Sequence, residues 1–180
     1  MMNLPNFLAS LRIGLAPLMF VFLVNRNLPC FEGIHSTWMD YFAALIFVIS
    51  SATDFFDGYI ARNWDQKTQL GAILDPLADK MLTLGAFLGL MMIDRASPWA
   101  IFLILTREFF ITGLRVAAVS EGKDIAASMA GKVKTVLQMI AIGFLMMNWP
   151  FAEALLWVAV LLTLYSGYEY ILGYTKKGTN

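Results

Sequence analysis

The chain has 180 residues, about the length of one domain, and 59% of them are hydrophobic while only 14% are charged. This composition departs from that of soluble globular proteins and indicates several membrane-spanning segments. The 13 basic and 13 acidic residues balance, so nothing in the charge suggests a nucleic-acid partner. The single cysteine, Cys30, excludes an internal disulfide, and the single histidine, His35, excludes a multi-histidine metal site.

Six mainly apolar stretches are each long enough, at about 20 residues, to cross a bilayer as a helix. They cover residues 4–24, 38–62, 76–93, 98–119, 130–149 and 151–174. Arg12 lies inside the first stretch and no basic segment precedes it, which is typical of a retained segment rather than a cleaved signal peptide. Since no internal repeat or linker is visible, the sequence predicts an all-α integral membrane protein with six transmembrane helices in a single domain, residues 1–180.

Four aspartates stand close together where the second span ends and the third begins. Carboxylates at membrane depth are costly, and they usually serve a function in a bundle interior or a watery cavity. Asp54 and Asp57, at i and i+3, lie on one helical stripe that continues through Gly58 and Ala61. This stripe therefore directs two carboxylates to the same side of the second span.

A second pair of carboxylates belongs to the next helix. Asp75 and Asp79 are at i and i+4, so they share one helical face. Proline favours the first helical turn, so Pro76 predicts that the helix begins there with Asp75 as its cap. Sites made only of carboxylate oxygens suit hard divalent ions, so the acidic segment from Asp54 to Asp79 predicts a site for Mg²⁺ or Mn²⁺.

Basic residues predict which side of the membrane the connections occupy. Because the number of spans is even, both termini lie on the same side. Placing them in the cytoplasm leaves only Arg26 and Arg95 outside and puts eight basic residues inside. These eight are Arg62, Lys67, Arg115, Lys123, Lys132, Lys134, Lys176 and Lys177. The positive-inside rule therefore predicts cytoplasmic termini and an acidic segment at the cytoplasmic rim, within reach of a soluble molecule and a lipid headgroup.

Polar and charged side chains return in the fourth and fifth spans: Thr106, Arg107, Glu108, Arg115, Lys132 and Lys134. Glu108 and Arg115 share a helical face, and Arg107 lies within about a quarter turn of it. One interpretation is a structural Arg–Glu pair that satisfies itself; the other is a site for an anion. Lys132 and Lys134 point to roughly opposite sides of a helix, so only one is expected to face such a site.

The spacing in the acidic segment resembles the complete signature of the CDP-alcohol phosphotransferase family: Asp54-x2-Asp57-Gly58-x2-Ala61-Arg62-x8-Gly71-x3-Asp75-x3-Asp79. Every fixed position is filled. Three further segments resemble the bacterial phosphatidylglycerophosphate synthase branch of that family: NLPNFLASLRIGLAP, TREFFITGLRVAAVSEGKDIAAS and GKVKTVLQMIAI. The resemblance therefore covers nearly the whole chain.

The resemblance implies transfer of the phosphatidyl group from CDP-diacylglycerol to sn-glycerol 3-phosphate, with release of CMP. It implies two divalent ions, Mg²⁺ or Mn²⁺, on Asp54, Asp57, Asp75 and Asp79, and Asp79 is also the candidate general base. It implies a cytidine diphosphate pocket lined by Gly58, Ala61, Arg62 and Gly71. The acceptor phosphate would meet Arg107, Arg115 and one or both of Lys132 and Lys134, with Glu108 orienting the arginines and Thr106 supporting them.

The same resemblance implies a homodimer in the bacterial cytoplasmic (inner) membrane, with a polar cavity open to the cytoplasm. Two other functions stay open. One is a phosphatidyltransferase of the same family that uses inositol phosphate, serine or another alcohol, which the central aspartates cannot distinguish. The other is a cation transporter, for which carboxylates near the bilayer midplane and broken helices in related halves would be expected. The rim position of the aspartates and the lack of a half-repeat disfavour the transporter.

Overall fold

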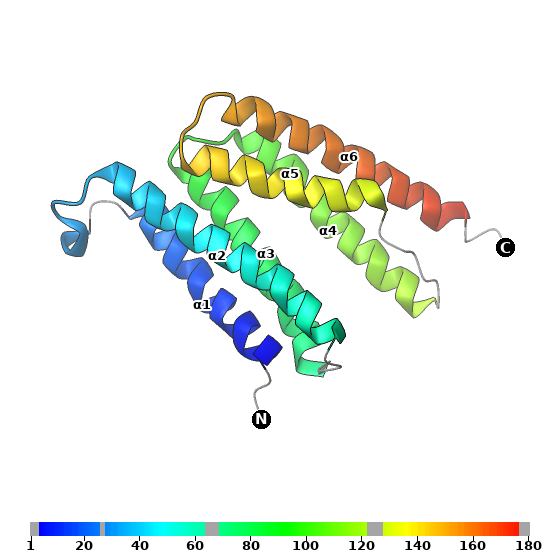
Figure 1. The fold of residues 1–180 in the computed structure, drawn as a ribbon. Coiled ribbons are helices and arrows are strands. Elements are labelled where there is room, and N and C mark those ends of the chain that lie inside the picture. Colours follow the sequence, from blue (N-terminus) through cyan, green and yellow to red (C-terminus); the bar gives the residue numbers. More distant parts are fainter. Residues whose placement is uncertain (1–3, 26–27, 64–68, 122–127, 177–180) are drawn as a thin grey trace. The chain divides into compact units, whose positions relative to one another are not determined.

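The structure, a computed structural model, describes residues 4–25, 28–63, 69–121 and 128–176. For residues 4–6, 30, 54–63, 69–76 and 176 it describes the backbone only. All regular structure in these ranges is helical, as Figure 1 shows. The helices are α1 (Leu4–Val24), the short 3-10 helix η1 (Pro29–Phe31), α2 (Ser36–Asn63), α3 (Gln69–Met92), α4 (Pro98–Ser120), α5 (Met129–Met146) and α6 (Ala152–Lys176).

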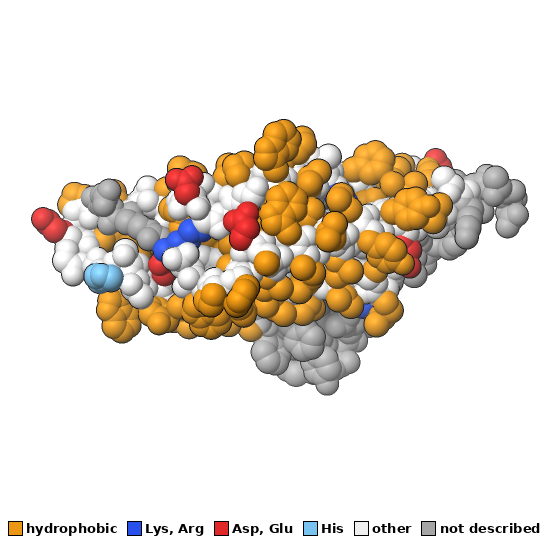
Figure 2. Space-filling model, turned by 90° about the horizontal axis from the view of Figure 1, so that it is seen from above, with side chains coloured by type: hydrophobic (Ala, Val, Ile, Leu, Met, Phe, Trp, Pro, Cys, Tyr) orange, Lys and Arg blue, Asp and Glu red, His pale blue; other side chains and the backbone are white. Residues whose placement is uncertain are grey.

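Each of the six predicted spans corresponds to one of the long helices, which confirms the all-helical fold. Within the described residues, three helices contain a stretch apolar and long enough to cross a membrane: Phe7–Val24, Met129–Met146 and Ala152–Thr175. The helix α4 has a comparable length of 23 residues, but it carries Arg107, Glu108 and Arg115. Hydrophobic side chains are spread over much of the face drawn in Figure 2, with a few charged groups between them.

The start of α3 differs from the prediction. This helix begins at Gln69, so Pro76 lies inside it and Asp75 is not its cap. A proline inside a helix removes one backbone hydrogen bond and crowds the preceding turn. Interior prolines are nevertheless tolerated in membrane helices, where the freed backbone groups find other partners, and α3 continues through Pro76. Asp75 and Asp79 are consequently both interior residues of α3, one turn apart.

The helices group into two compact units. The first contains Met1–Arg95 with Leu145–Trp149, and the second contains Ala96–Phe144 with Pro150–Asn180. The first unit is thus built from α1, α2 and α3, and α1 packs against both of the others. The second unit is built from α4, α6 and most of α5.

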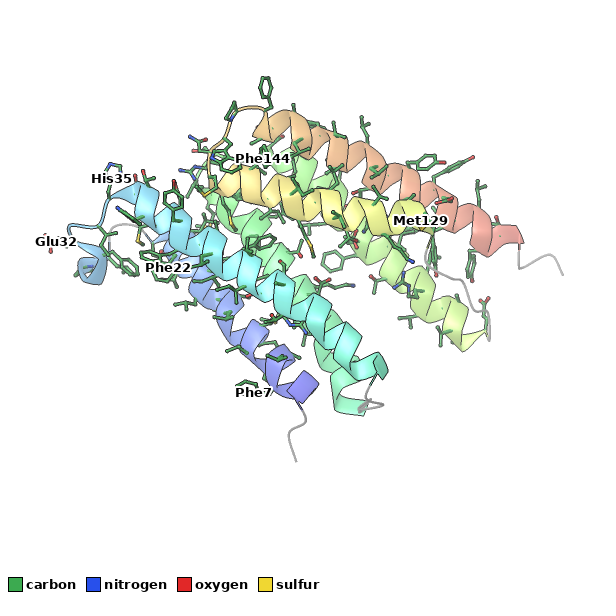
Figure 3. All side chains as sticks on the ribbon, viewed as in Figure 1. Phe7, Phe22, Glu32, His35, Met129 and Phe144 are labelled. Carbon is green, nitrogen blue, oxygen red and sulfur yellow. The ribbon has the colours of Figure 1, made fainter. Side chains whose placement is uncertain are left out.

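Small and aromatic residues bring the helices of the first unit together. A methyl group added to Gly89 of α3 would lie 2.6 Å from Leu23 Cδ2 of α1, and one added to Gly85 would lie 3.7 Å from Met19 Cε. These glycines therefore let α1 approach α3 closely, which is ordinary helix packing. Phe22 of α1, labelled in Figure 3, stacks obliquely on Phe42 of α2 with 5.6 Å between the ring centroids.

Polar contacts join the three helices of the second unit. Gln138 of α5 donates a hydrogen bond from Nε2 to Thr163 Oγ1 of α6 at 2.8 Å, and both side chains are buried. At the end of α4, Tyr174 of α6 donates its hydroxyl proton to the carboxylate of Glu121, at 3.0 Å from Oε1. These bonds fix which residues of α4, α5 and α6 stand at the same level.

Candidate functional site

The acidic segment falls on two helices of the first unit. Asp54, Asp57, Gly58, Ala61 and Arg62 lie in α2, and Gly71, Asp75 and Asp79 lie in α3. The stripe and the pair predicted from the spacing are thus on continuous helices, as required for side chains one turn apart to share a face. Of these residues only Asp79 is within the described side chains, and the others lie outside them.

The metal prediction depends on the side chains that are not described. Among the described residues no group of three or more His, Cys, Asp or Glu side chains is placed to hold a metal. Asp79 is half-buried and follows Ala78, which is fully buried. Its carboxylate supplies the oxygen ligands that Mg²⁺ and Mn²⁺ prefer, so the chemistry of this donor fits such an ion.

A second group of charges lies in the second unit, and we call Arg107, Glu108, Lys134 and Ser166 the α4–α6 polar cluster. Arg107 donates from Nη1 to Glu108 Oε1 at 3.2 Å and from Nη2 to Ser166 Oγ at 2.8 Å. Lys134 Nζ of α5 donates to the same Glu108 Oε1. One carboxylate oxygen of α4 therefore accepts from both cations, while Ser166 ties Arg107 to α6.

The α4–α6 polar cluster carries more positive than negative charge. Two cations, Arg107 and Lys134, share one carboxylate, so its formal charge is +1. The side chains of these cations are only 11% and 8% exposed, and Glu108 is 30% exposed. In addition, Arg107 Nε is buried without a hydrogen-bond partner. A buried donor of this kind has capacity for a further acceptor, and a guanidinium suits an anionic one.

The structure distinguishes the two lysines that the sequence offers for the acceptor phosphate. Lys134 is buried and belongs to the α4–α6 polar cluster, whereas Lys132 is exposed. Only one of them faces Glu108, in line with their positions on roughly opposite sides of α5. Thr106 and Arg115 are also exposed, and Arg115 places its guanidinium carbon 5.9 Å from the ring centroid of Tyr170. The structure thus brings Arg107, Glu108 and Lys134 into direct contact.

Comparison with known proteins identifies the family. Residues 2–165 match the model of the CDP-alcohol phosphatidyltransferases. The chain belongs to this family. The resemblance inferred from the acidic segment is thereby confirmed.

Several bacterial relatives of this CDP-alcohol phosphatidyltransferase are similar over nearly their whole length. A protein of Bacillus subtilis (strain 168) is 41% identical over 181 residues, which covers 94% of both chains. One from Rickettsia felis is 36% identical over 178 residues, covering 93% of both chains. One from Shigella flexneri serotype 5b is 36% identical over 180 residues, covering 94% of this chain and 93% of the relative. All three are named CDP-diacylglycerol–glycerol-3-phosphate 3-phosphatidyltransferase.

The sequence analysis of this CDP-alcohol phosphatidyltransferase did not identify three residues of α6 that contact Arg107 or Arg115. They are Ser166, Gly167 and Tyr170. A methyl group added to Gly167 would lie 3.1 Å from both Cγ and Nε of Arg107, so the glycine makes room for that side chain. A serine–glycine pair inside an otherwise apolar span is the one local signal that points to a close approach. Their relation to Arg107 and Arg115 depends on how α6 packs against α4, which no spacing within α6 encodes.

Proposed function

We propose that the chain transfers the phosphatidyl group of CDP-diacylglycerol to sn-glycerol 3-phosphate, forming phosphatidylglycerophosphate and CMP. The observation that carries this proposal is the alignment with relatives named for that reaction over at least 93% of this chain. Alignment of that extent includes both the acidic segment and the α4–α6 polar cluster. The alignment therefore includes the residues proposed to bind the lipid donor and those proposed to bind the acceptor.

The proposed location is the bacterial cytoplasmic membrane, with six spans, cytoplasmic termini and a polar site open to the cytoplasm. The helices α2, α3 and α4 contain 28, 24 and 23 residues. At about 1.5 Å per residue each exceeds the roughly 30 Å of a hydrocarbon core, which supports spans in addition to the three apolar ones. We propose that residues 1–180 act as one domain, since the family match includes helices of both units. The homodimer remains a prediction from the resemblance.

In this proposal Asp54, Asp57, Asp75 and Asp79 hold two divalent ions, Mg²⁺ or Mn²⁺. When bound, such ions neutralise charge on a diphosphate and on its leaving group. The helical positions of these aspartates, one turn apart on α2 and one turn apart on α3, support a shared role. Gly58, Ala61, Arg62 and Gly71 are the proposed lining of the cytidine diphosphate pocket.

Asp79 is the proposed general base. Its carboxylate accepts the proton of the primary hydroxyl of glycerol 3-phosphate, and that oxygen forms a bond to the phosphorus bearing diacylglycerol. The bond from this phosphorus to the bridging oxygen breaks, and the oxygen leaves as part of CMP. No covalent intermediate on the protein is needed.

The acceptor phosphate is proposed to bind the α4–α6 polar cluster. The unsatisfied donor Arg107 Nε supports an anion there. Arginine and lysine donate charge-assisted hydrogen bonds to phosphate, and Glu108 holds both cations in place. Arg115, Lys132 and Thr106 are exposed and contribute from the edge of the site.

The experiment that tests this function uses the purified protein in detergent with Mg²⁺ or Mn²⁺ and labelled CDP-diacylglycerol. Release of CMP is measured with glycerol 3-phosphate, inositol, inositol phosphate and serine in turn. We expect release with glycerol 3-phosphate and little with the others. A preference for another alcohol would replace the proposed acceptor. The matched control is Asp79→Asn, which should fold normally and release no CMP; activity in this variant would remove Asp79 as the base.

A further inference from the structure

Two serines of α2 that the proposed function does not use have buried hydroxyls. In the part of the chain that the structure describes, Ser50 Oγ and Ser51 Oγ have no hydrogen-bond partner. Ser50 is 0% exposed, and Ser51 is half-buried. Hydroxyls inside helices can bond carbonyl oxygens of the preceding turn, and Thr53 Oγ1 does so, at 3.0 Å from the oxygen of Ile49. The two serines therefore keep donor capacity that their own helix does not use.

These serines lie one turn from the acidic segment. The buried stripe of α2 consists of residues three or four apart: Met39, Ala43, Phe47 and Ser50. Positions 54, 57 and 58 continue this stripe with the same spacing. Position 54 comes three residues after Ser51 and four after Ser50, so both serines are its neighbours on the helix surface. Along the axis they lie about 4.5–6 Å from it, on the side away from the connection to α3.

An exposed apolar face of α2 lies beside the serines. Leu45, Val48 and Ile49 are 55%, 59% and 46% exposed, and their spacing places them on one face. At about 3.6 residues per turn, Ser51 falls between this face and the buried stripe. In a bilayer such a face meets lipid chains. Ser51 thus stands where a lipid that lies along α2 would come closest to the buried hydroxyls.

The proposed lipid donor has suitable acceptors at this depth. Under the proposed function its diphosphate binds at the acidic segment, near the cytoplasmic end of α2, and its chains extend toward the membrane interior. The two ester groups stand between the diphosphate and the chains, which brings them to the level of Ser50 and Ser51. An ester carbonyl oxygen only accepts hydrogen bonds, so it complements a hydroxyl donor. Rotation about the Cα–Cβ bond can turn a serine hydroxyl to a ligand while the helix stays in place.

We propose that Ser50 and Ser51 donate hydrogen bonds to ester carbonyl oxygens of the lipid donor and make the chain selective for ester-linked lipids. A CDP-dialkylglycerol carries ether links without these carbonyl oxygens, so it leaves both hydroxyls unsatisfied. A site built to hydrogen-bond a ligand group discriminates against an analogue that lacks this group. The inference rests on the proposed function for the position of the lipid donor, and it adds how the linkage of that lipid is recognised.

The binding test measures Kd for CDP-diacylglycerol and for a CDP-dialkylglycerol of equal chain length, using the full chain in detergent with Mg²⁺ and no acceptor. The wild type should bind the ester lipid about tenfold more tightly than the ether lipid. The double variant Ser50→Ala/Ser51→Ala should bind the ester lipid about tenfold more weakly than the wild type and the ether lipid within about twofold of it. Equal Kd values in the wild type, or an unchanged ratio in the double variant, would overturn the proposal.

The matched control for the binding test is Thr53→Val. This change removes a hydroxyl that is already bonded to the carbonyl oxygens of Ile49 and Ser50 in its own helix. It should therefore keep the wild-type ratio of the two Kd values. A ratio that fell as far in Thr53→Val as in the double variant would contradict the assignment to Ser50 and Ser51.

Thermal unfolding of the lipid-free protein distinguishes lipid binding from a structural role of the hydroxyls. Removing a buried hydroxyl without a partner costs no hydrogen bond, and alanine favours the helix, so the double variant should melt no lower than the wild type. A melting temperature lower by about 4 °C or more would mean that the hydroxyls bond within the protein, and it would overturn the proposal.

The outcomes also separate this inference from the proposed function. If the wild type binds the ester lipid more tightly but releases no CMP with glycerol 3-phosphate, the proposed acceptor fails while the lipid selectivity stands. If CMP is released and the double variant keeps the wild-type ratio of Kd values, only the role of Ser50 and Ser51 fails. If the wild type binds neither lipid, both fail.

Discussion

Two groups of charged side chains in this chain are bound in different ways. In the first unit Arg95 meets one carboxylate, with Nη2 2.7 Å from Asp40 Oδ2, and its Nη1 donates to the carbonyl oxygen of Met146 at 2.6 Å. In the second unit Arg107 and Lys134 share a single oxygen of Glu108. In the first group one guanidinium bonds a carboxylate and a backbone carbonyl, and in the second group two cations bond the same carboxylate oxygen.

This difference separates a structural ion pair from a candidate binding site. Removal of an ion pair of the first kind is expected to affect stability. A buried donor without a partner, such as Arg107 Nε, keeps capacity for a further acceptor. The sequence leaves both interpretations open for Arg107 and Glu108, and the unsatisfied Arg107 Nε is the described feature that fits an anion site.

The largest expected effect comes from removing the buried lysine of the cluster. Lys134→Met should raise KM for glycerol 3-phosphate about 10-fold to 100-fold, because a charge-assisted hydrogen bond contributes about 1.5–3 kcal/mol. Lys132→Met is the matched comparison, since it removes the same charge two residues away from an exposed position at the edge of the site, and it should raise this KM less. Steady-state kinetics with each variant makes the measurement. Equal increases in KM in the two variants would mean that the buried position of Lys134 makes no special contribution to acceptor binding.

Breaking the Arg95–Asp40 ion pair should lower the stability of the fold rather than weaken acceptor binding. Asp40→Asn leaves Arg95 without its carboxylate and should destabilise the fold by about 2 kcal/mol, or about 6 °C in melting temperature. The KM for glycerol 3-phosphate should stay within about twofold. Thermal unfolding and kinetics on the same preparation separate the two quantities. If Asp40→Asn raised KM for glycerol 3-phosphate without lowering the melting temperature, the Arg95–Asp40 pair would not be a purely structural ion pair.

The sequence predicts the helices well because a long apolar stretch in a chain of this composition has few alternatives to a helix. Its error at the start of α3 comes from treating Pro76 as a boundary, whereas the helix begins at Gln69 and continues through this proline. The residue types of the candidate site, Arg107, Glu108 and Lys134, were also predictable from their cost in an apolar segment. The metal and nucleotide roles stay predictions.

The contacts of the site required the tertiary structure. One residue separates Lys132 from Lys134 in the sequence, and only the packing of α5 against α4 shows which of the two lysines is buried. Ser166 and Gly167 bear on Arg107 because α6 lies beside α4. Nothing within either helix encodes that neighbour. A sequence can therefore indicate which charges need a partner without indicating which small residues make room for them.

A smaller effect should follow from crowding Arg107 without changing any charge. Gly167→Ala places a methyl group 3.1 Å from Arg107 Cγ and Nε, so the side chain must shift by a few tenths of an ångström. We expect KM for glycerol 3-phosphate to rise about fivefold, because charge-assisted bonds depend on geometry. Gly143→Ala, in α5 of the same unit, meets nothing within 4 Å and is the control in the same kinetic assay. If both variants behave like the wild type, the position of Arg107 is not critical.

The smallest effect concerns Arg115, which is exposed and lies over the ring of Tyr170. An exposed cation–π contact contributes about 0.5–1 kcal/mol, so Arg115→Ala should raise KM for glycerol 3-phosphate about threefold and leave KM for CDP-diacylglycerol unchanged. Tyr170→Leu removes the ring but keeps the charge, and it should reproduce part of this rise if the ring holds the guanidinium in place. Tyr170→Phe keeps the ring, and since the buried hydroxyl has no hydrogen-bond partner, its kinetics should match the wild type. Equal changes in both KM values for Arg115→Ala would place Arg115 outside the acceptor site, and the α4–α6 polar cluster alone would then bind the phosphate.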